Sequence, residues 1–225
     1  MTELALEAPA TQPVQQPQAS RPKPAAPKKN AVLEQLASLY PALFGETPVP
    51  LKRGIFQDLQ AAHPDMFERE ALKTALGLHT RSTRYLNGVS VGLGRHDLTM
   101  QVVETMAPLH TFQALAEVYR RKHQRTGKDV RRELHNRIAQ AFDASGMTRD
   151  SYAALVLTRD EALNSIVDSA LAEAAERGAR DEALLRAFEA GTATLKEFAD
   201  MYGLGTAFAQ ASLARARAKK AIAST

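Results

Sequence analysis

The chain has 225 residues, of which 44% are hydrophobic and 24% charged, a composition that fits one or two globular domains with a sizeable core. It contains no cysteine, which excludes disulfides, thiolate metal sites and cysteine nucleophiles and is typical of a reducing compartment. No apolar run approaches the roughly 18 residues of a membrane span, and residues 1–30 hold no hydrophobic segment of a secretory signal. We therefore expect a cytoplasmic protein.

The net charge is +4, and the excess of Lys and Arg lies within the first 126 residues. Residues 127–225 hold fourteen basic and fourteen acidic side chains. A mild basic excess is a weak indication of a polyanionic partner. Its position predicts that such a partner binds the first half of the chain.

Residues 1–29 are rich in Pro, Gln and Ala and are predicted to form a disordered basic tail, because they bury too little apolar area to offset the entropy of ordering. Apolar residues at helical spacing then predict a helix over residues 31–44, with Asn30 as its N-cap. A second helix is expected over 50–62, with Pro50 in the first position, and a third over 68–78.

The only good strand signal follows Asn87-Gly88, a dipeptide typical of a turn. Residues 89–91 alternate as a strand does, glycines at 92 and 94 favour a turn, and residues 95–98 would return as the second strand. A long helix is expected over 108–124, with three cations in its last turns.

Residues 127–225 are predicted to be entirely helical. Thr148 is a candidate N-cap, and the pattern Thr158-x-x-Glu161 predicts a capping box that starts a helix through about residue 175, which Gly178 would end. A further helix is expected over 181–190, and Thr194-x-x-Glu197 repeats the capping box. We divide this half into a helical accessory region, 127–211, and a basic C-terminal tail, 212–225.

Motifs for catalysis are missing from the sequence. It has no His-Glu-x-x-His, no Gly-rich loop followed by Lys-Ser/Thr and no Gly-x-Ser-x-Gly, and its six histidines are scattered without the spacing of metal ligands. We therefore expect no enzyme, no cofactor and no metal.

Four blocks carry the strongest functional signal: 50-PLKRGIFQDL-59, 72-LKTAL-76, 82-STRYL-86 and 94-GRHDL-98. In this order and at these spacings they resemble the ProQ/FinO family of bacterial RNA chaperones, over residues 30–126. The resemblance implies a compact, mostly α-helical RNA-binding domain with one small β-hairpin. It implies structured RNA partners, such as small regulatory RNAs and mRNA 3′ ends, with a terminator-like hairpin and a single-stranded 3′ tail. It also implies stabilisation of small RNAs and promotion of RNA–RNA pairing.

Carried over to this sequence, the family's RNA-binding face falls on Lys52, Lys73, Arg84, Tyr85 and Arg95, with Arg69 at a further basic position. The residues themselves agree in part. Arg69 and Lys73 share a helix face, and Arg84-Tyr85 joins a phosphate-binding guanidinium to a ring that can stack on a base.

Two further groups of residues extend this predicted face. Thr80 and Ser82 are expected at a helix N-terminus, whose free N–H groups suit a phosphate. Arg120, Arg121 and Lys122 extend the RNA face or complement a helix dipole. Tyr85 as a core residue and Lys52 as a plain solvated side chain remain open alternatives.

Two other functions also remain open. Residues 194–204 read like the first helix and turn of a DNA-binding helix-turn-helix. The second half is alternatively a helical module for self-association or for a protein partner. The cations at 215, 217, 219 and 220 suit an electrostatic tail for RNA or a solvated helix end.

Overall fold

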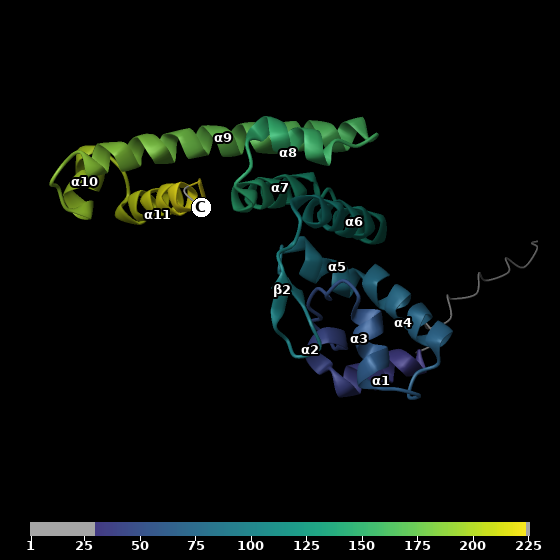
Figure 1. Ribbon diagram of the computed structural model, residues 1–225. Helices are drawn as coiled ribbons and strands as arrows, with labels where there is room; N and C mark the ends of the chain where they lie inside the picture. Colours follow the sequence, from purple (N-terminus) through teal and green to yellow (C-terminus); the bar gives the residue numbers. More distant parts are fainter. Residues whose placement is uncertain (1–29, 224–225) are drawn as a thin grey trace, which may run out of the picture.

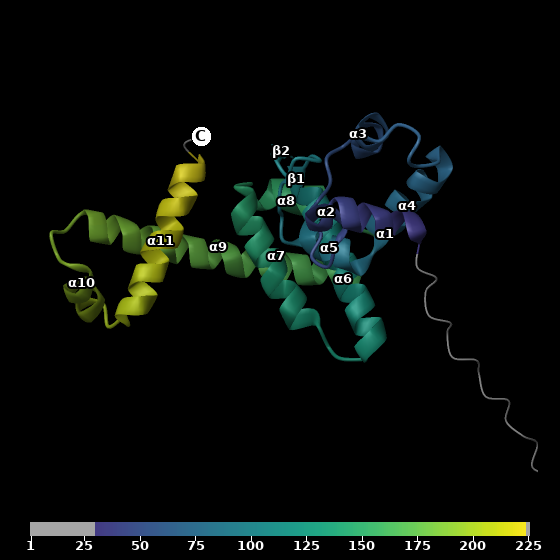
Figure 2. The same ribbon diagram turned by 90° about the horizontal axis from the view of Figure 1, so that it is seen from below.

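The computed structural model describes residues 30–223 (Figures 1 and 2). The tail predicted for residues 1–29 lies outside this range, as do residues 224–225. The mostly helical fold with one small hairpin is confirmed. In chain order the elements are α1 (Ala31–Leu39), α2 (Pro41–Phe44), α3 (Ile55–Ala62), α4 (Arg69–Arg81), α5 (Thr83–Ser90), β1 (Arg95–His96), β2 (Val102–Glu104), α6 (Pro108–Thr126), α7 (Arg131–Ser145), α8 (Arg149–Val156), α9 (Glu161–Glu189), α10 (Leu195–Met201) and α11 (Thr206–Ala223).

The N-terminal lobe is a small helical domain built from α1–α5 and the hairpin. Its helices begin where side chains can accept the first free N–H groups: Asn30 caps α1 as predicted, Glu68 caps α4 and Ser82 caps α5. One continuous core fills the lobe, and Leu36, Leu59 and Leu72 at its centre are fully buried.

The second helix begins later than the sequence predicted. Pro50 is not its first residue, because residues 50–52 are extended and lie along the hairpin. Leu51 bridges His96, the His96 N–H donates to the Pro50 carbonyl, and the Lys52 N–H donates to the His96 carbonyl. The helix α3 starts only after Gly54, whose φ of +88° is a conformation that favours glycine.

The strand predicted at 89–91 is wrong, because Val89 and Ser90 complete α5. Gly88 is not a turn residue. It allows α5 to pass the carbonyl of Pro48, which lies 2.7 Å from where a Cβ of residue 88 would stand. The hairpin pairs Arg95–His96 with Val102–Glu104, and Asp97 closes its turn by accepting hydrogen bonds from the Thr99 and Gln101 N–H groups.

The helix α6 packs on both sides. It lies against α5 in the N-terminal lobe, and its Phe112, Leu115 and Tyr119 enter a second core with residues from α7, α8 and the first half of α9. The most buried members of that second core are Ile138, Tyr152 and Leu171. The family-like region and the helices after residue 126 therefore share a core through α6.

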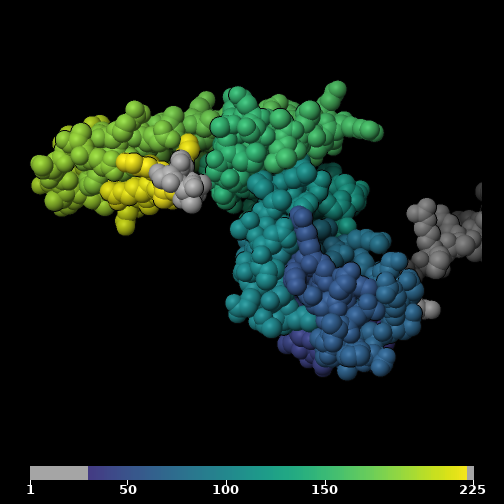
Figure 3. Space-filling view, in the orientation of Figure 1, coloured from purple at the N-terminus to yellow at the C-terminus, as the bar shows by residue number. Residues whose placement is uncertain are grey.

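A single helix, α9, replaces the two helices predicted over residues 161–190. It has 29 residues and is ~43 Å long at 1.5 Å per residue, and it forms the long bar of Figures 1 and 3. Gly178 does not end it, since α7 and α11 pack along α9 on either side of this point. Asp160, and not Thr158, is its N-cap.

The distal lobe lies at the far end of α9, where α10 and α11 turn back (Figure 1). The capping box of Thr194 and Glu197 is confirmed. In α11, Leu213 and Ala216 pack against Leu185 of α9, and α11 crosses α9 in Figure 2. Within residues 30–223 no helix is both long and apolar enough to cross a bilayer.

Candidate nucleic-acid interface

One row of α4 carries the basic residues of the first candidate surface. Arg69, Lys73, Gly77 and Arg81 follow at i, i+4 spacing and therefore share a face. Arg69 lies over the ring of Phe56, 5.5 Å from its centroid, and Lys73 is exposed, with Glu70 3.7 Å away. The Arg81 guanidinium lies against Gly77, 3.2 Å from where a Cβ would stand. A side chain at 77 would crowd this arginine.

The junction between α4 and α5 differs from the expected helix start in one residue. Thr80 is still inside α4 and donates its hydroxyl to the Leu76 carbonyl, so it does not present a helix N-terminus. Ser82 does so, since its hydroxyl accepts the N–H of Tyr85 and caps α5. The N–H groups of the first residues of a helix have no partner within it.

Arg121 connects α6 to this junction. Its Nη1 donates to the Arg81 carbonyl at 2.8 Å and to the Thr83 hydroxyl at 3.0 Å. Its Nε donates to Glu117. Glu117 also accepts from Arg120, and the hydrogen bonds of the two arginines lower the pKa of Glu117 to about 2. The structure thus brings Arg121 to the start of α5, while Arg120 lies in an exposed pair with Glu117.

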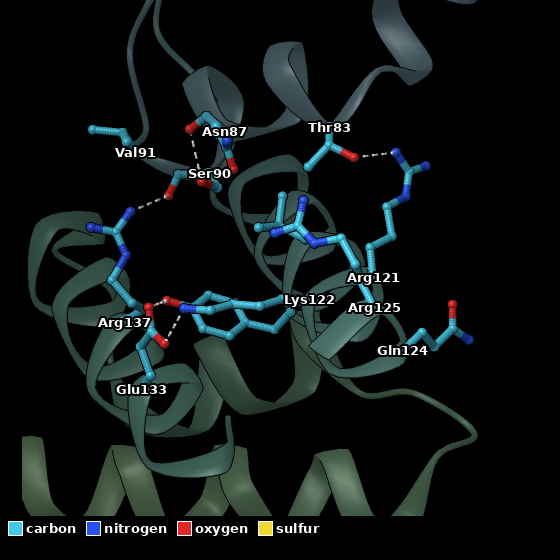
Figure 4. A pocket seen from close by; sticks show the side chains of 12 residues that line it. Thr83, Asn87, Ser90, Val91, Arg121, Lys122, Gln124, Arg125, Glu133 and Arg137 are labelled. Atoms are coloured by element: carbon cyan, nitrogen blue, oxygen red, sulfur yellow. Dashed lines mark hydrogen bonds and ion pairs between the residues drawn. The ribbon is translucent and has the colours of Figure 1, made fainter. Parts of the chain in front are cut away.

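A basic groove of about 850 Å³ runs between α5, α6 and α7 (Figure 4). Arg121 and Arg125 enter it from the α6 side, and Arg137 enters it from the opposite, α7 side. Its lining residues are Thr83, Asn87, Ser90, Val91, Val118, Tyr119, Arg121, Lys122, Gln124, Arg125, Glu133 and Arg137.

Lys122 and Glu133 form the floor of the basic groove. Lys122 lies over the ring of Tyr119 at 5.6 Å and forms an ion pair with Glu133. Glu133 also accepts the Tyr119 hydroxyl. Burial and this hydrogen bond raise the pKa of Tyr119 to about 12, and the Lys122 contact lowers the pKa of Glu133. Glu133 therefore holds Lys122 in place, and Arg121, Arg125 and Arg137 line the groove beside it.

Tyr85 requires a correction. Its side chain lies in the core and only 6% of the residue is exposed, so its ring is not presented for stacking. Its hydroxyl accepts the N–H of Leu51, and its ring packs edge-on against His79. Tyr85 therefore connects α5 to the extended segment at residue 51 and supports the surface from below.

Arg95 and Lys52 also differ from the expected face. The Arg95 side chain is 15% exposed and donates to the Leu51 carbonyl, with Glu104 3.7 Å from its Nε. Lys52 is half-buried and pairs with Asp58 at 2.8 Å. Arg95 thus ties the hairpin to the segment before α3, and Lys52 ties that segment to α3 itself. Arg69, Lys73 and Arg84 remain as the exposed cations of the predicted face.

The sequence reasoning missed Arg81, Arg125 and Arg137. Arg81 and Arg125 had a usable signal, since Arg81 lies two helical turns after Lys73 and Arg125 lies one turn after Arg121. Arg137 had none, because its place in the groove depends on how α7 packs against α6.

The comparisons with known proteins converge on one family. Residues 26–131 match the model of the ProQ/FINO family. The RNA chaperone ProQ of Shewanella frigidimarina is 43% identical over 74 residues, covering 31% of this chain and 36% of that protein. The RNA chaperone ProQ of Shewanella oneidensis is 38% identical over 92 residues, covering 39% of this chain and 43% of that protein. The chain thus matches less than half the length of these two relatives.

A solved structure gives a further similarity. The crystal structure of a FinO-like RNA chaperone from Neisseria meningitidis is 30% identical, covers 38% of this chain and 93% of its own chain, and aligns with a TM-score of 0.33.

Proposed function

Residues 26–131 of this chain belong to the ProQ/FinO family, and on that basis we propose that the protein is an RNA-binding chaperone. One observation in the structure supports it most directly. Arg121 brings the basic end of α6 to the N-terminus of α5, beside the exposed Arg84. Guanidinium groups and helix N-terminal N–H groups both bind phosphate oxygens well.

We propose a hairpin RNA with a single-stranded 3′ tail as the preferred ligand. The helix start at Ser82 and the surrounding cations suit an unpaired strand end, whose phosphates are accessible and whose 2′-hydroxyls distinguish RNA from DNA. Small regulatory RNAs and mRNA 3′ ends carry such ends. Their stabilisation and their pairing with other RNAs are the proposed cellular outcomes, in the cytoplasm and without a catalytic step.

The helices beyond residue 126 have a second proposed role. Self-association or binding of a protein partner through residues 127–211 stays a prediction. A DNA-binding helix-turn-helix is the weaker alternative, because residues 206–214 of α11 hold few side chains able to hydrogen-bond to base edges.

The test uses the full chain and three labelled ligands: a hairpin RNA with a uridine tail, the same hairpin without the tail, and a DNA duplex of equal length. Fluorescence anisotropy should rank them in that order, with the tailless hairpin bound clearly more weakly. A preference for duplex DNA, or no binding of the tailed hairpin, would contradict the proposed function. Equal binding of the two hairpins would contradict only the proposed tail specificity.

A further inference from the structure

We infer that α7 forms the second wall of the RNA-binding site and that Arg137 contacts a phosphate of the bound RNA strand. The inference rests on the proposed function, and it adds to the site a helix that lies beyond the family-matched residues 26–131, except for Arg131. It also changes the expectation that the first 126 residues carry the whole interface.

The two ends of α5 are each held by a guanidinium from another helix. Arg121 of α6 donates to Thr83 at the start of α5, and Arg137 of α7 donates to the Ser90 carbonyl at its end, at 3.3 Å. The basic groove runs between them along α5, as Figure 4 shows. A strand that leaves the N-terminus of α5 along the groove passes directly between these two arginines.

Arg137 retains hydrogen-bonding capacity for a ligand. A guanidinium carries five N–H donors in a fixed plane, and Arg137 has one hydrogen bond within residues 30–223, the one to Ser90. It is half-buried and lies on the groove side of α7. Such a guanidinium is pre-positioned for a phosphate, because little side-chain entropy remains to be lost on binding.

The charge of the groove favours an anion. Four cations line it, Arg121, Lys122, Arg125 and Arg137, and Glu133 is the one acid in its lining. Glu133 is already bound by Lys122 and Tyr119. The Arg125 side chain has neither a hydrogen bond nor an ion pair to any residue of the described chain, and Figure 4 shows it directed into the groove. An RNA phosphate supplies the missing counter-charge.

A shared core fixes the α7 wall to α6. Val130, Leu134 and Ile138 of the α7 segment share a core with Phe112, Leu115 and Tyr119 of α6. The same residues that complete the core of α6 therefore set the position of Arg137. Cutting the chain at residue 126 would expose this apolar face of α6 and remove one wall of the site.

The test compares two variants of the full chain that each lose one positive charge, Arg137→Gln and Arg132→Gln. Gln removes the charge, and because it is two bonds shorter than Arg it also gives up the contact to the Ser90 carbonyl, so the melting temperature of each variant is the control for folding. Arg132 is the matched control: it lies five residues earlier on α7, is exposed, has no side-chain partner within residues 30–223, and lines a different depression beside α9. Binding of the tailed hairpin RNA is measured by anisotropy at several salt concentrations.

Arg137→Gln should weaken binding about fivefold, equivalent to ~1 kcal/mol, and lower the salt slope by about 0.7–0.9. Arg132→Gln should change affinity by less than about twofold. Glu133→Gln should tighten binding, because it removes the acid of the groove. Its amide oxygen can still accept from Lys122, and its NH2 group can donate to the Tyr119 hydroxyl.

Three results would overturn the inference while the proposed function stands, provided the wild-type chain binds the RNA. One is equal weakening by Arg137→Gln and Arg132→Gln, which indicates only a general charge effect. Another is unchanged binding in both. The last is weaker binding by Glu133→Gln at unchanged melting temperature. Failure of the wild-type chain to bind the RNA would instead contradict the proposed function itself.

Discussion

The basic groove and the distal lobe carry similar numbers of cations but use them differently. In α11, Arg215, Lys219 and Lys220 pair with Asp181, Glu182 and Glu189 of α9, and Arg217 lies over the ring of Phe188. In the groove region, the side chains of Arg84 and Arg125 have no hydrogen bond or ion pair to any residue between 30 and 223. The cations of α11 are thus held by side chains of α9, whereas Arg84, Arg125 and Arg137 around the groove have no ion pair within residues 30–223.

This difference shows that local neutralisation matters more than the count of basic residues. Residues 127–225 are balanced in total, yet residues 120–137 alone hold eight Lys and Arg and two acids. The excess lies where α6 ends and α7 begins, on both sides of the boundary drawn from the sequence. Counting charge by halves of the chain divides this cluster and hides it.

The largest expected effect is on stability and comes from beneath the basic surface. Tyr85→Ala should lower the free energy of unfolding by about 3–5 kcal/mol, the usual cost of removing a large buried aromatic side chain. Tyr85→Phe should cost about 1 kcal/mol, because it removes the acceptor of the Leu51 N–H. Urea unfolding measures both. If Tyr85→Ala kept the parent's stability and lost RNA affinity, the ring would belong to the interface.

The next effect tests the comparison directly with two triple variants. The groove variant combines Arg84→Ala, Arg121→Ala and Arg125→Ala. It should bind the tailed hairpin about 100-fold more weakly, or by ~2.7 kcal/mol, and lower the salt slope by about two units or more. The distal variant combines Arg217→Ala, Lys219→Ala and Lys220→Ala, and it should bind the same RNA less than about threefold more weakly. The melting temperature serves as the control for both. Equal losses in the two variants would mean that net charge alone drives binding.

The sequence predicted the helices of this protein well wherever a cap or a regular apolar spacing marked them, as at Asn30, Thr148 and Thr194. It failed where tertiary contacts override local preference. The glycines at 88 and 178 read as breaks, but one lies against the Pro48 carbonyl and the other within a helix covered by its neighbours. A pattern within one segment contains no information about such contacts.

The candidate site was predictable to a similar extent. The family blocks placed the predicted RNA-binding face on α4 and α5, which stays a prediction, and spacing alone put Arg69 and Lys73 on one face of α4, where both are exposed. Burial separated Tyr85 and Arg95 from that face, since both side chains point into the molecule. The sequence could not predict the position of Arg137, because only the packing of α7 on α6 brings this residue to Ser90.

A third effect concerns pH and the N-terminal lobe. His79 is buried between the rings of Phe44 and Tyr85. Burial lowers its pKa to about 4; a backbone hydrogen bond at Leu43 opposes this shift, and the charge of Arg84 adds to it. The unfolded chain takes up a proton near pH 6.5 and the folded chain does not, so stability falls as the pH drops below 6.5.

Between pH 7 and pH 5 this residue should remove about 2 kcal/mol of unfolding free energy. Urea unfolding at the two pH values measures the loss. His79→Phe serves as the control and should lose less stability over the same range. The same pH dependence in the control would assign the effect to other groups. Limited proteolysis at the two pH values shows which part of the chain is destabilised. If the distal lobe became protease-sensitive first, the pH effect would not arise from His79 in α4.

The smallest effect probes the paired cations of the distal lobe. Asp181 is buried and accepts two hydrogen bonds from Arg215, at 2.7 and 2.9 Å. Asp181→Asn keeps the shape and removes the charge, so it should cost about 1–2 kcal/mol, or roughly 2–8 °C in melting temperature. RNA affinity should change by less than about twofold, because Arg215 is not among the residues that line the basic groove. Glu182→Gln is the matched control: its pair with Lys219 is exposed, and such pairs contribute less than about 1 kcal/mol.

A severalfold tighter binding of RNA by Asp181→Asn would contradict this prediction. It would mean that the released Arg215 contacts RNA, and that the ion pairs with α9 normally keep the cations of α11 from binding RNA.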